Sequence, residues 1–243
     1  MPGRPQEVVL GEDAPILEVM QTMRAMRRLA PDPVPDALLE RLVEAATWAP
    51  SGSNAQQYQF IVVTDRAVMA EIGVLWRRVV AAYLKSLGAV TPEVMEDAAY
   101  GRMVDAIKHQ AEHFDATPAL IVPCYSSAAT QRRVGVRRTL ALFSSLGAVD
   151  GLRMVGRLPR MGPVSEGSSI YPGVQNLLLT ARALGLAANI TAWHLFLEHE
   201  FNRVLRVPRG VHTYALIPVG WPEGRMGPVK RRPVAEVIHR DRW

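Results

Sequence analysis

Two short stretches in the first quarter of the chain decide how the sequence is interpreted. They are Met23-Arg24-Ala25-Met26-Arg27-Arg28-Leu29 and Trp48-Ala49-Pro50-Ser51-Gly52-Ser53-Asn54-Ala55-Gln56. Arginines of the first stretch can neutralise a phosphate. The second stretch offers backbone N–H groups and short polar side chains to ring nitrogens and carbonyls. Together the two stretches predict a site for a planar, polar, phosphorylated ligand.

A third polar cluster lies near the other end of the chain. It is Lys230-Arg231-Arg232-Pro233, in a tail rich in proline and arginine. Taken alone, each of the three clusters is more often a solvated surface or a simple turn. Their order and context therefore carry the argument, and the hypothesis requires the fold to bring distant basic residues together.

The spacing of apolar residues predicts interspersed helices and strands. Helices are expected over 16–28, 36–47, 65–87, 91–115, 171–184 and 198–205, and strands over 58–63, 119–125, 187–192 and 214–219. Asp65 is placed to cap one helix and Gly185 to end another. This order predicts an α+β sandwich in which helices flank a mixed sheet of four strands.

The chain is expected to form a single domain over 14–243 after a flexible tail over 1–13. Residues 126–170 are rich in arginine, glycine and proline, and they are expected to form a variable lid or insert. Residues 220–243 contain too little apolar material to fold alone. They are expected to cross to a partner subunit and to add a strand there.

Composition narrows the class of protein. The 243 residues are 49% hydrophobic and 21% charged, which is ordinary for a globular protein. No apolar run approaches the roughly 18 residues that span a bilayer, and the N-terminus lacks the apolar core of a secretion signal. The single cysteine, Cys124, excludes an internal disulfide and is expected to be a buried, inert thiol. We therefore expect a cytoplasmic protein with no membrane partner.

The first two stretches, with Pro33-Val34-Pro35-Asp36 between them, resemble the N-terminal signature of the FMN-dependent nitroreductase family. The resemblance covers residues 20–64 and 171–236 well and residues 65–170 in outline. Further motifs that carry it are Gln175-Asn176-Leu177-Leu178-Leu179, Ala183-Leu184-Gly185-Leu186, Ile217-Pro218-Val219-Gly220-Trp221-Pro222 and Lys230-Arg231-Arg232-Pro233. The resemblance implies an intertwined homodimer with two FMN molecules at its interface, each touching both subunits.

The resemblance also implies which residues hold the cofactor. Arg24 and Arg27 would lie near the FMN phosphate and the pyrimidine edge of the flavin, and Lys230 and Arg232 would reach the phosphate. Residues from a loop would line the flavin of the partner subunit, and backbone donors near the ring would come from a later turn. The loop residues are Pro50, Ser51, Gly52, Asn54 and Gln56, and the turn residues are Thr191 and Ala192.

This sequence departs from the family pattern at three places. Met23 stands where the family commonly has arginine, and Ala25, at a cofactor-binding position, stands where it has serine. Gln56-Gln57-Tyr58 replaces the family's Gln-Pro-Trp. The departures put in doubt one arginine contact to the phosphate and one hydroxyl contact.

The activity that the resemblance implies is an FMN-dependent NAD(P)H oxidoreductase. It would pass electrons to a small acceptor such as a nitroaromatic or a quinone by a ping-pong mechanism. NAD(P)H would bind transiently, since no Gly-x-Gly-x-x-Gly follows a strand. No side chain is predicted as acid or base, because the cofactor carries the chemistry. The donor stays open between NADH, NADPH and a deazaflavin.

Two other functions are weaker alternatives. His109-Gln110-Ala111-Glu112-His113 matches a zinc hydrolase pattern, in which two histidines on one helix face would bind the metal. A motif of five residues also arises by chance, so no metal is expected. The second alternative is a nucleic-acid-binding protein, suggested by the basic run Arg132, Arg133, Arg137 and Arg138. Aromatic residues do not interleave with these arginines as stacking platforms would, so no nucleic acid is expected either.

Overall fold

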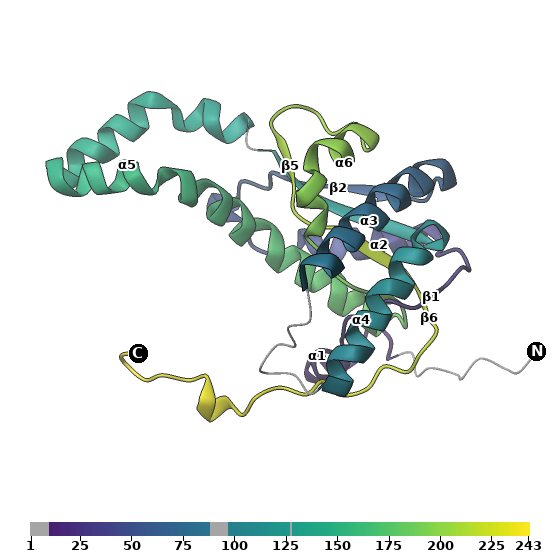
Figure 1. Cartoon of the computed structure of the whole chain (residues 1–243). Helices are drawn as coiled ribbons and strands as arrows, with labels where there is room; N and C mark the ends of the chain where they lie inside the picture. The colour runs from purple at the N-terminus through teal and green to yellow at the C-terminus, as the bar shows by residue number, and fades with distance from the viewer. Residues whose placement is uncertain (1–9, 88–96, 127) are drawn as a thin grey trace, which may run out of the picture.

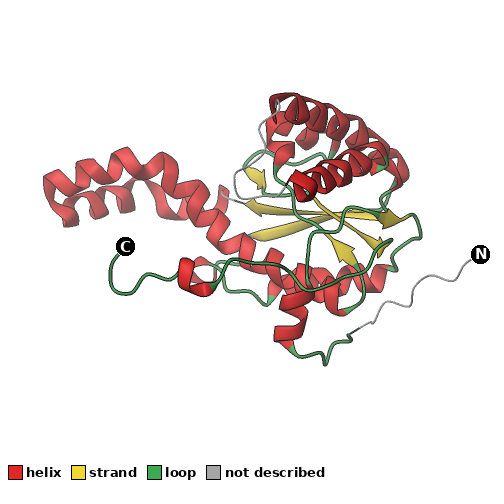
Figure 2. Cartoon of the chain, turned by 60° about the horizontal axis from the view of Figure 1, so that its bottom comes forward, coloured by secondary structure: helices red, strands yellow, loops and turns green. Residues whose placement is uncertain are grey.

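The structure is a computed structural model that describes residues 10–87, 97–126 and 128–243. A twisted sheet lies at the centre, with helices on both of its faces (Figures 1 and 2). The described strands follow the order β1-β6-β3-β2, while β4 also pairs with β6 and β5 with β3. Their bounds are β1 Leu29–Ala30, β2 Tyr58–Val63, β3 Ala119–Ser126, β4 Ala187–Ala188, β5 Val211–Thr213 and β6 Ile217–Pro222. The predicted α+β class is confirmed.

All pairings among the described strands are antiparallel, so the expected mixed sheet is wrong. The connection between β2 and β3 shows the physical reason. Two helices, α3 (Arg66–Leu87) and α4 (Asp97–Glu112), lie between these neighbouring strands. A single crossover helix would bring the chain back so that the next strand ran parallel to β2. The second helix reverses the chain direction once more, so β3 runs antiparallel to β2.

The apolar core has two halves, one on each face of the sheet. Strand β3 is buried on both faces, because Ile121 points into one half while Leu120 and Val122 point into the other. The first half packs under α2 (Asp36–Thr47) and α5 (Ala128–Ala183), and the second packs under α3, α4 and α6 (Glu198–Val204).

Several local predictions are confirmed. Helix α2 and strand β2 have the expected bounds, and the Asp65 Oδ1 atom accepts hydrogen bonds from the N–H groups of Ala67 and Val68 at 2.7 and 3.1 Å. Gly185 ends α5 with a φ of +76°, a left-handed backbone that glycine adopts without strain. Helix α4 begins at Asp97, and the start expected near Thr91 lies outside the described residues.

Three predicted elements differ from the structure. Helix α1 (Ile16–Thr22) ends before the arginines, because Met23 is extended and the following segment bonds to other parts of the chain. The strand expected over 187–192 is reduced to β4 and an isolated bridge between Thr191 and Leu216. Of the strand expected over 214–219, only 217–219 form a strand, as the start of β6, and β5 ends at Thr213, before the expected range begins.

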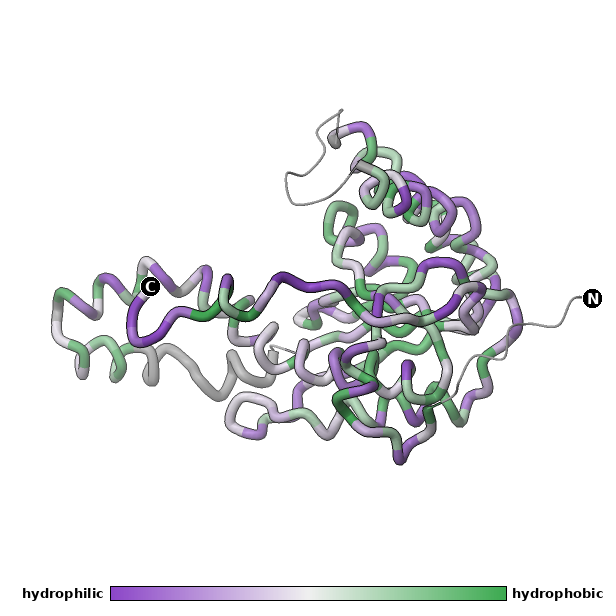
Figure 3. Tube along the Cα trace, turned by 90° about the horizontal axis from the view of Figure 1, so that it is seen from below, coloured by the Kyte–Doolittle hydropathy of each residue, from purple (hydrophilic) through white to green (hydrophobic). Residues whose placement is uncertain are grey.

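Residues 126–170, expected as a lid or insert, belong mostly to α5. Figure 1 shows this segment leaving the body as a helical arm and doubling back. Gly147 has a φ of +77°, which interrupts the right-handed helix. Side chains of the arm such as Leu140, Val149 and Leu152 are exposed. The C-terminal tail also leaves the body, as a mostly hydrophilic segment without strands that contains one apolar stretch (Figure 3).

The described helices include none with the length and apolar character that crossing a membrane requires. Cys124 is buried in β3, and burial raises the pKa of its thiol to about 12. The prediction that the thiol is buried is confirmed, and a raised pKa disfavours the reactive thiolate.

Candidate flavin site

The arginine segment over 23–28 is a non-helical segment held by hydrogen bonds from two sides. The Met26 N–H donates to the Ala188 carbonyl at 3.4 Å, at the end of β4, and the Glu223 N–H donates to the Arg28 carbonyl at 3.2 Å. These bonds explain why the segment is not helical. Arg24 and Ala25 are exposed, whereas Arg27 is half-buried.

Arg27 points toward a small cavity between this segment and α4. Burial lowers the pKa of its guanidinium, and no carboxylate pairs with it among the described residues. The cavity is lined by Arg27, Leu29, His109, Gln110, His113 and Thr117. A half-buried cation without a counter-ion favours a negative or electron-rich group beside it.

The C-terminal tail brings the third cluster to the first. The Val229 N–H donates to the Gln21 carbonyl at 2.9 Å, so Lys230 follows directly beside the last turn of α1. Lys230 and Arg232 are exposed. Basic segments from opposite ends of the chain therefore meet, as the hypothesis requires.

The turn that carries Thr191 and Ala192 follows β4 and so lies next to the arginine segment. The Thr191 N–H already donates to the Leu216 carbonyl at 3.0 Å, and it is not free to donate to a ring. The Ala192 N–H has no protein acceptor in the described part of the chain, and Ala192 is exposed. Of the two predicted backbone donors, Ala192 is the one that stays available.

The loop over 50–56 is preformed but lies apart from these groups. Its backbone has positive φ at Ser53, Asn54 and Gln56, and the Gly52 N–H donates to the Ser169 hydroxyl of α5 at 3.1 Å. The loop also holds itself together, since the Gln56 N–H donates to Ser51 Oγ at 3.1 Å. Within the described residues, no hydrogen bond joins this loop to the arginine segment or the tail. Among the loop residues predicted for the cofactor, Pro50, Gly52, Asn54 and Gln56 are exposed and Ser51 is half-buried.

A buried amide pair beside the site was missed by the sequence analysis. Gln110 Nε2 donates to Asn189 Oδ1 at 2.8 Å, with both side chains buried, and Asn189 Nδ2 has no hydrogen-bond partner among the described residues. Asn189 follows β4 directly, and Gln110 lines the cavity of Arg27. The only available signal was a polar residue between apolar neighbours, Ala188 and Ile190.

The zinc hypothesis gains no support from the structure. The rings of His109 and His113 are stacked with centroids 4.2 Å apart, and His113 Nδ1 lies 2.9 Å from the His109 carbonyl. The described residues contain no group of three or more His, Cys, Asp or Glu that could hold a metal, and Glu112 does not complete one. The side chains of Arg132, Arg133, Arg137 and Arg138 lie outside the described part.

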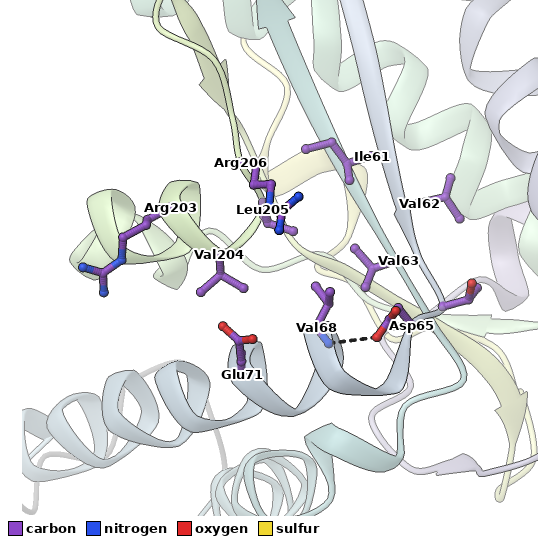
Figure 4. Close-up of a pocket in the computed structure, with 11 residues that line it drawn as sticks. Ile61, Val62, Val63, Asp65, Val68, Glu71, Arg203, Val204, Leu205 and Arg206 are labelled. Atoms are coloured by element: carbon purple, nitrogen blue, oxygen red, sulfur yellow. Dashed lines mark hydrogen bonds between the residues drawn. The ribbon is translucent and has the colours of Figure 1, made fainter.

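A separate groove of about 680 Å³ lies along the open edge of β2, between the start of α3 and the end of α6 (Figure 4). It is lined by Ile61, Val62, Val63, Thr64, Asp65, Val68, Glu71, Arg203, Val204, Leu205 and Arg206. None of the residues predicted for the cofactor lies in it. Its Asp65 carboxylate is also committed to the cap of α3, so we do not assign the site here.

Comparison with known proteins identifies the class of the chain. Residues 21–221 match the Nitroreductase family, and the chain belongs to that family of oxidoreductases. A relative from Methanothermobacter thermautotrophicus, whose name combines NADH dehydrogenase and NAD(P)H nitroreductase, is 25% identical over 94% of this chain and 87% of its own. The family match ends before Lys230 and Arg232.

Solved structures share the fold. Iodotyrosine deiodinase bound to FMN and 3-iodo-L-tyrosine superposes with a TM-score of 0.65 at 16% identity, over 94% of this chain and all of the other. A nitroreductase with bound FMN from Desulfitobacterium hafniense gives a TM-score of 0.60 at 19% identity, over 92% and 97% of the two chains. The nitroreductase-like fold predicted for the sequence is thereby confirmed.

Proposed function

We propose that this protein binds FMN at a site shared by two subunits and passes electrons from NAD(P)H to a small acceptor such as a nitroaromatic or a quinone. One observation carries the proposal. The hydrogen bonds from Met26 to Ala188 and from Val229 to Gln21 bring the arginine segment, the Ala192 turn and the basic tail to one place. The names of relatives that bind FMN or use NAD(P)H agree with it.

The residues present fit FMN. A half-buried Arg27 without a carboxylate partner suits the electron-rich pyrimidine edge, and the free Ala192 N–H suits a ring acceptor. Arg24, Lys230 and Arg232 are exposed cations that suit the phosphate. Ala25 offers no hydroxyl and would contribute only backbone.

A homodimer explains why the loop over 50–56 is preformed but remote from these groups. Pro50, Ser51, Gly52, Asn54 and Gln56 would line the flavin held by the other subunit, while Ser169 holds the loop in place. The exposed apolar residues of the tail, Val237 and Ile238 among them, would be covered by the same partner.

Bound FMN would supply the two-electron chemistry, by a ping-pong mechanism in which nicotinamide leaves before the acceptor binds. The protein would contribute binding, orientation and charge. Arg27 would hold a positive charge beside the site of developing negative charge, and so favour reduction. No side chain is assigned as acid or base. The buried Cys124 thiol suits the reducing cytoplasm in which we place the protein.

The visible spectrum of the purified protein tests the proposal most directly. We expect bands of oxidised flavin that bleach anaerobically on addition of NADPH or NADH, because the donor reduces the resident cofactor. Parallel additions of the two donors decide between them, and a reduced deazaflavin serves as the third donor. A colourless protein that takes up no FMN supplied in excess would contradict the proposal.

Replacing Arg232 by alanine should weaken FMN binding by on the order of 1–3 kcal/mol, the scale of a hydrogen bond to a charged group. The dissociation constant is measured by fluorescence titration of the apoprotein. Arg240→Ala removes the same charge from the exposed end of the same tail and serves as the control. An unchanged affinity in Arg232→Ala would remove Arg232 from the site.

A further inference from the structure

Arg182 is a buried arginine whose charge has no counter-ion in the described structure. It lies in the last turn of α5, and only 6% of its surface is exposed. Its Nε donates to the Thr22 hydroxyl at 2.9 Å, but its buried Nη1 has no hydrogen-bond partner within the described residues. None of the ion pairs between described residues includes it. A buried, unpaired guanidinium is costly, and it is normally found paired with an anion.

The surroundings of Arg182 collect further positive charge. Thr22, which accepts its hydrogen bond, ends α1 and directly precedes the arginine segment. The neighbouring Gln21 carbonyl accepts from the Val229 N–H, which brings Lys230 alongside. Three segments that carry cations therefore meet at one turn of the chain: the end of α5, the arginine segment and the tail.

A role as a mere tie between α1 and α5 does not explain this arrangement. The two helices already pack through Val19, Leu179 and Ala183, with Met23 against the same cluster. The Thr22 hydroxyl accepts one hydrogen bond from Arg182. A neutral donor side chain at this position would make the same bond without burying a charge. A structural link between the helices accounts for the hydrogen bond of Nε, but it does not account for the buried Nη1, which has no partner among the described residues.

We propose that Arg182 is a phosphate-binding residue whose terminal nitrogens donate to the phosphate monoester of the cofactor. The inference rests on the proposed function and deepens it. Thr22 orients the guanidinium through Nε, and Nη1, which has no hydrogen-bond partner among the described residues, can donate to a phosphate oxygen. Arg182 thus supplies the cation that Met23 does not.

The decisive experiment compares FMN with riboflavin, which has the same ring system and lacks the phosphate. In apoprotein carrying Arg182→Met, the dissociation constant of FMN should rise about tenfold or more, as expected for loss of a charge-assisted bond. That of riboflavin should stay within about twofold. Adding Met23→Arg to this variant should restore part of the FMN affinity and leave riboflavin binding unchanged.

Thermal unfolding of the apoprotein distinguishes this role from a structural one. The phosphate role predicts that apo Arg182→Met melts at or above the wild-type temperature, because an unpaired buried charge has been removed. A structural tie predicts a lower melting temperature. Should Arg182→Met fail to fold, Thr22→Val keeps the charge, removes its orientation and should still weaken FMN binding selectively.

Each result has a defined meaning. Equal losses of FMN and riboflavin affinity, or an unchanged FMN affinity, would overturn the role of Arg182 and leave the proposed function standing. Wild-type protein that binds neither flavin would overturn the proposed function and this inference with it. A selective loss of FMN binding with an undiminished melting temperature supports both.

Discussion

Gly173→Ala should lower the free energy of unfolding by about 2–3 kcal/mol, the upper part of the usual range for overpacking. A Cβ atom at this position would lie 2.6 Å from the Ala46 carbonyl oxygen, closer than real Cβ contacts occur. The obstacle is backbone of α2, which cannot rotate away as a side chain could. The helices must therefore separate, and the better helix propensity of alanine offsets only about 1 kcal/mol of the cost.

The same substitution should also weaken cofactor binding at the candidate flavin site. Ser169, one turn before Gly173, holds the loop over 50–56 through the Gly52 N–H, and Asn176 Nδ2 donates to the Ala45 carbonyl at 3.2 Å. Separation of α2 from α5 displaces both contacts, so FMN affinity should fall together with stability.

Urea unfolding, with Gly156→Ala as the matched control, tests this prediction. Gly156 lies in the same helix, and a Cβ atom there would meet nothing within 4 Å. The control should be stabilised by up to about 1 kcal/mol, because alanine loses less backbone entropy than glycine. Equal effects of the two substitutions would show that α2 and α5 do not pack through Gly173 as described.

Elements decided by local chemistry could be predicted from the sequence. The apolar face of α2, the cap at Asp65 and the end of α5 at Gly185 depend on residues close together in the chain, and their predictions are confirmed. The spacing of Leu17, Met20 and Met23 predicts a helix that continues through the arginine segment. The segment is not helical because Met26 and Arg28 form backbone hydrogen bonds with Ala188 and Glu223. These partners lie more than 150 residues away in the sequence, so a pattern of neighbouring residues cannot reveal them.

The arm of α5 shows a second limit. Its glycines, and Pro159 and Pro163, are signals of loops, yet the segment is helical. Most of its described apolar residues are exposed in the single chain, so no regular burial pattern accompanies the helix.

The candidate site likewise contains residues that the sequence could reveal and residues that only the folded structure reveals. Arginines in a recognisable order could be found along the sequence, and the structure brings Arg24, Arg27 and Lys230 into one region. Arg182 and Asn189 could not be found, because an unpartnered buried nitrogen exists only after the chain has folded.

His194 should make the stability of the fold depend on pH between about 6.5 and 4. The side chain is fully buried beside the Ala192 turn, and its Nε2 lies 3.1 Å from Thr213 Oγ1. The Thr213 hydroxyl donates its proton to Asn202 Oδ1, so Nε2 must be the donor to Thr213 and Nδ1 carries no proton. Nδ1 has no partner in the part of the chain that the structure describes, and a proton there would be an unsatisfied buried charge.

Burial accordingly lowers the pKa of His194 from 6.5 to about 4, and a contact with the Thr213 backbone opposes the shift only in part. Below pH 6.5 His194 becomes protonated in the unfolded chain, whereas in the folded chain it stays neutral until the pH approaches 4. Stability is therefore complete above pH 6.5 and falls as the pH approaches 4, by about 3 kcal/mol in total for a shift of this size.

Urea unfolding between pH 7.5 and pH 4 should show this loss in the wild type and a shallower slope in His194→Gln, whose side chain does not titrate. His199→Gln, an exposed histidine on α6, should keep the wild-type slope. NMR titration of the folded wild type gives the same answer without a variant, because the His194 imidazole should stay neutral well below pH 6. A His194 that titrates near 6.5 would mean that water reaches its ring, and that the interior beside the Ala192 turn is not closed.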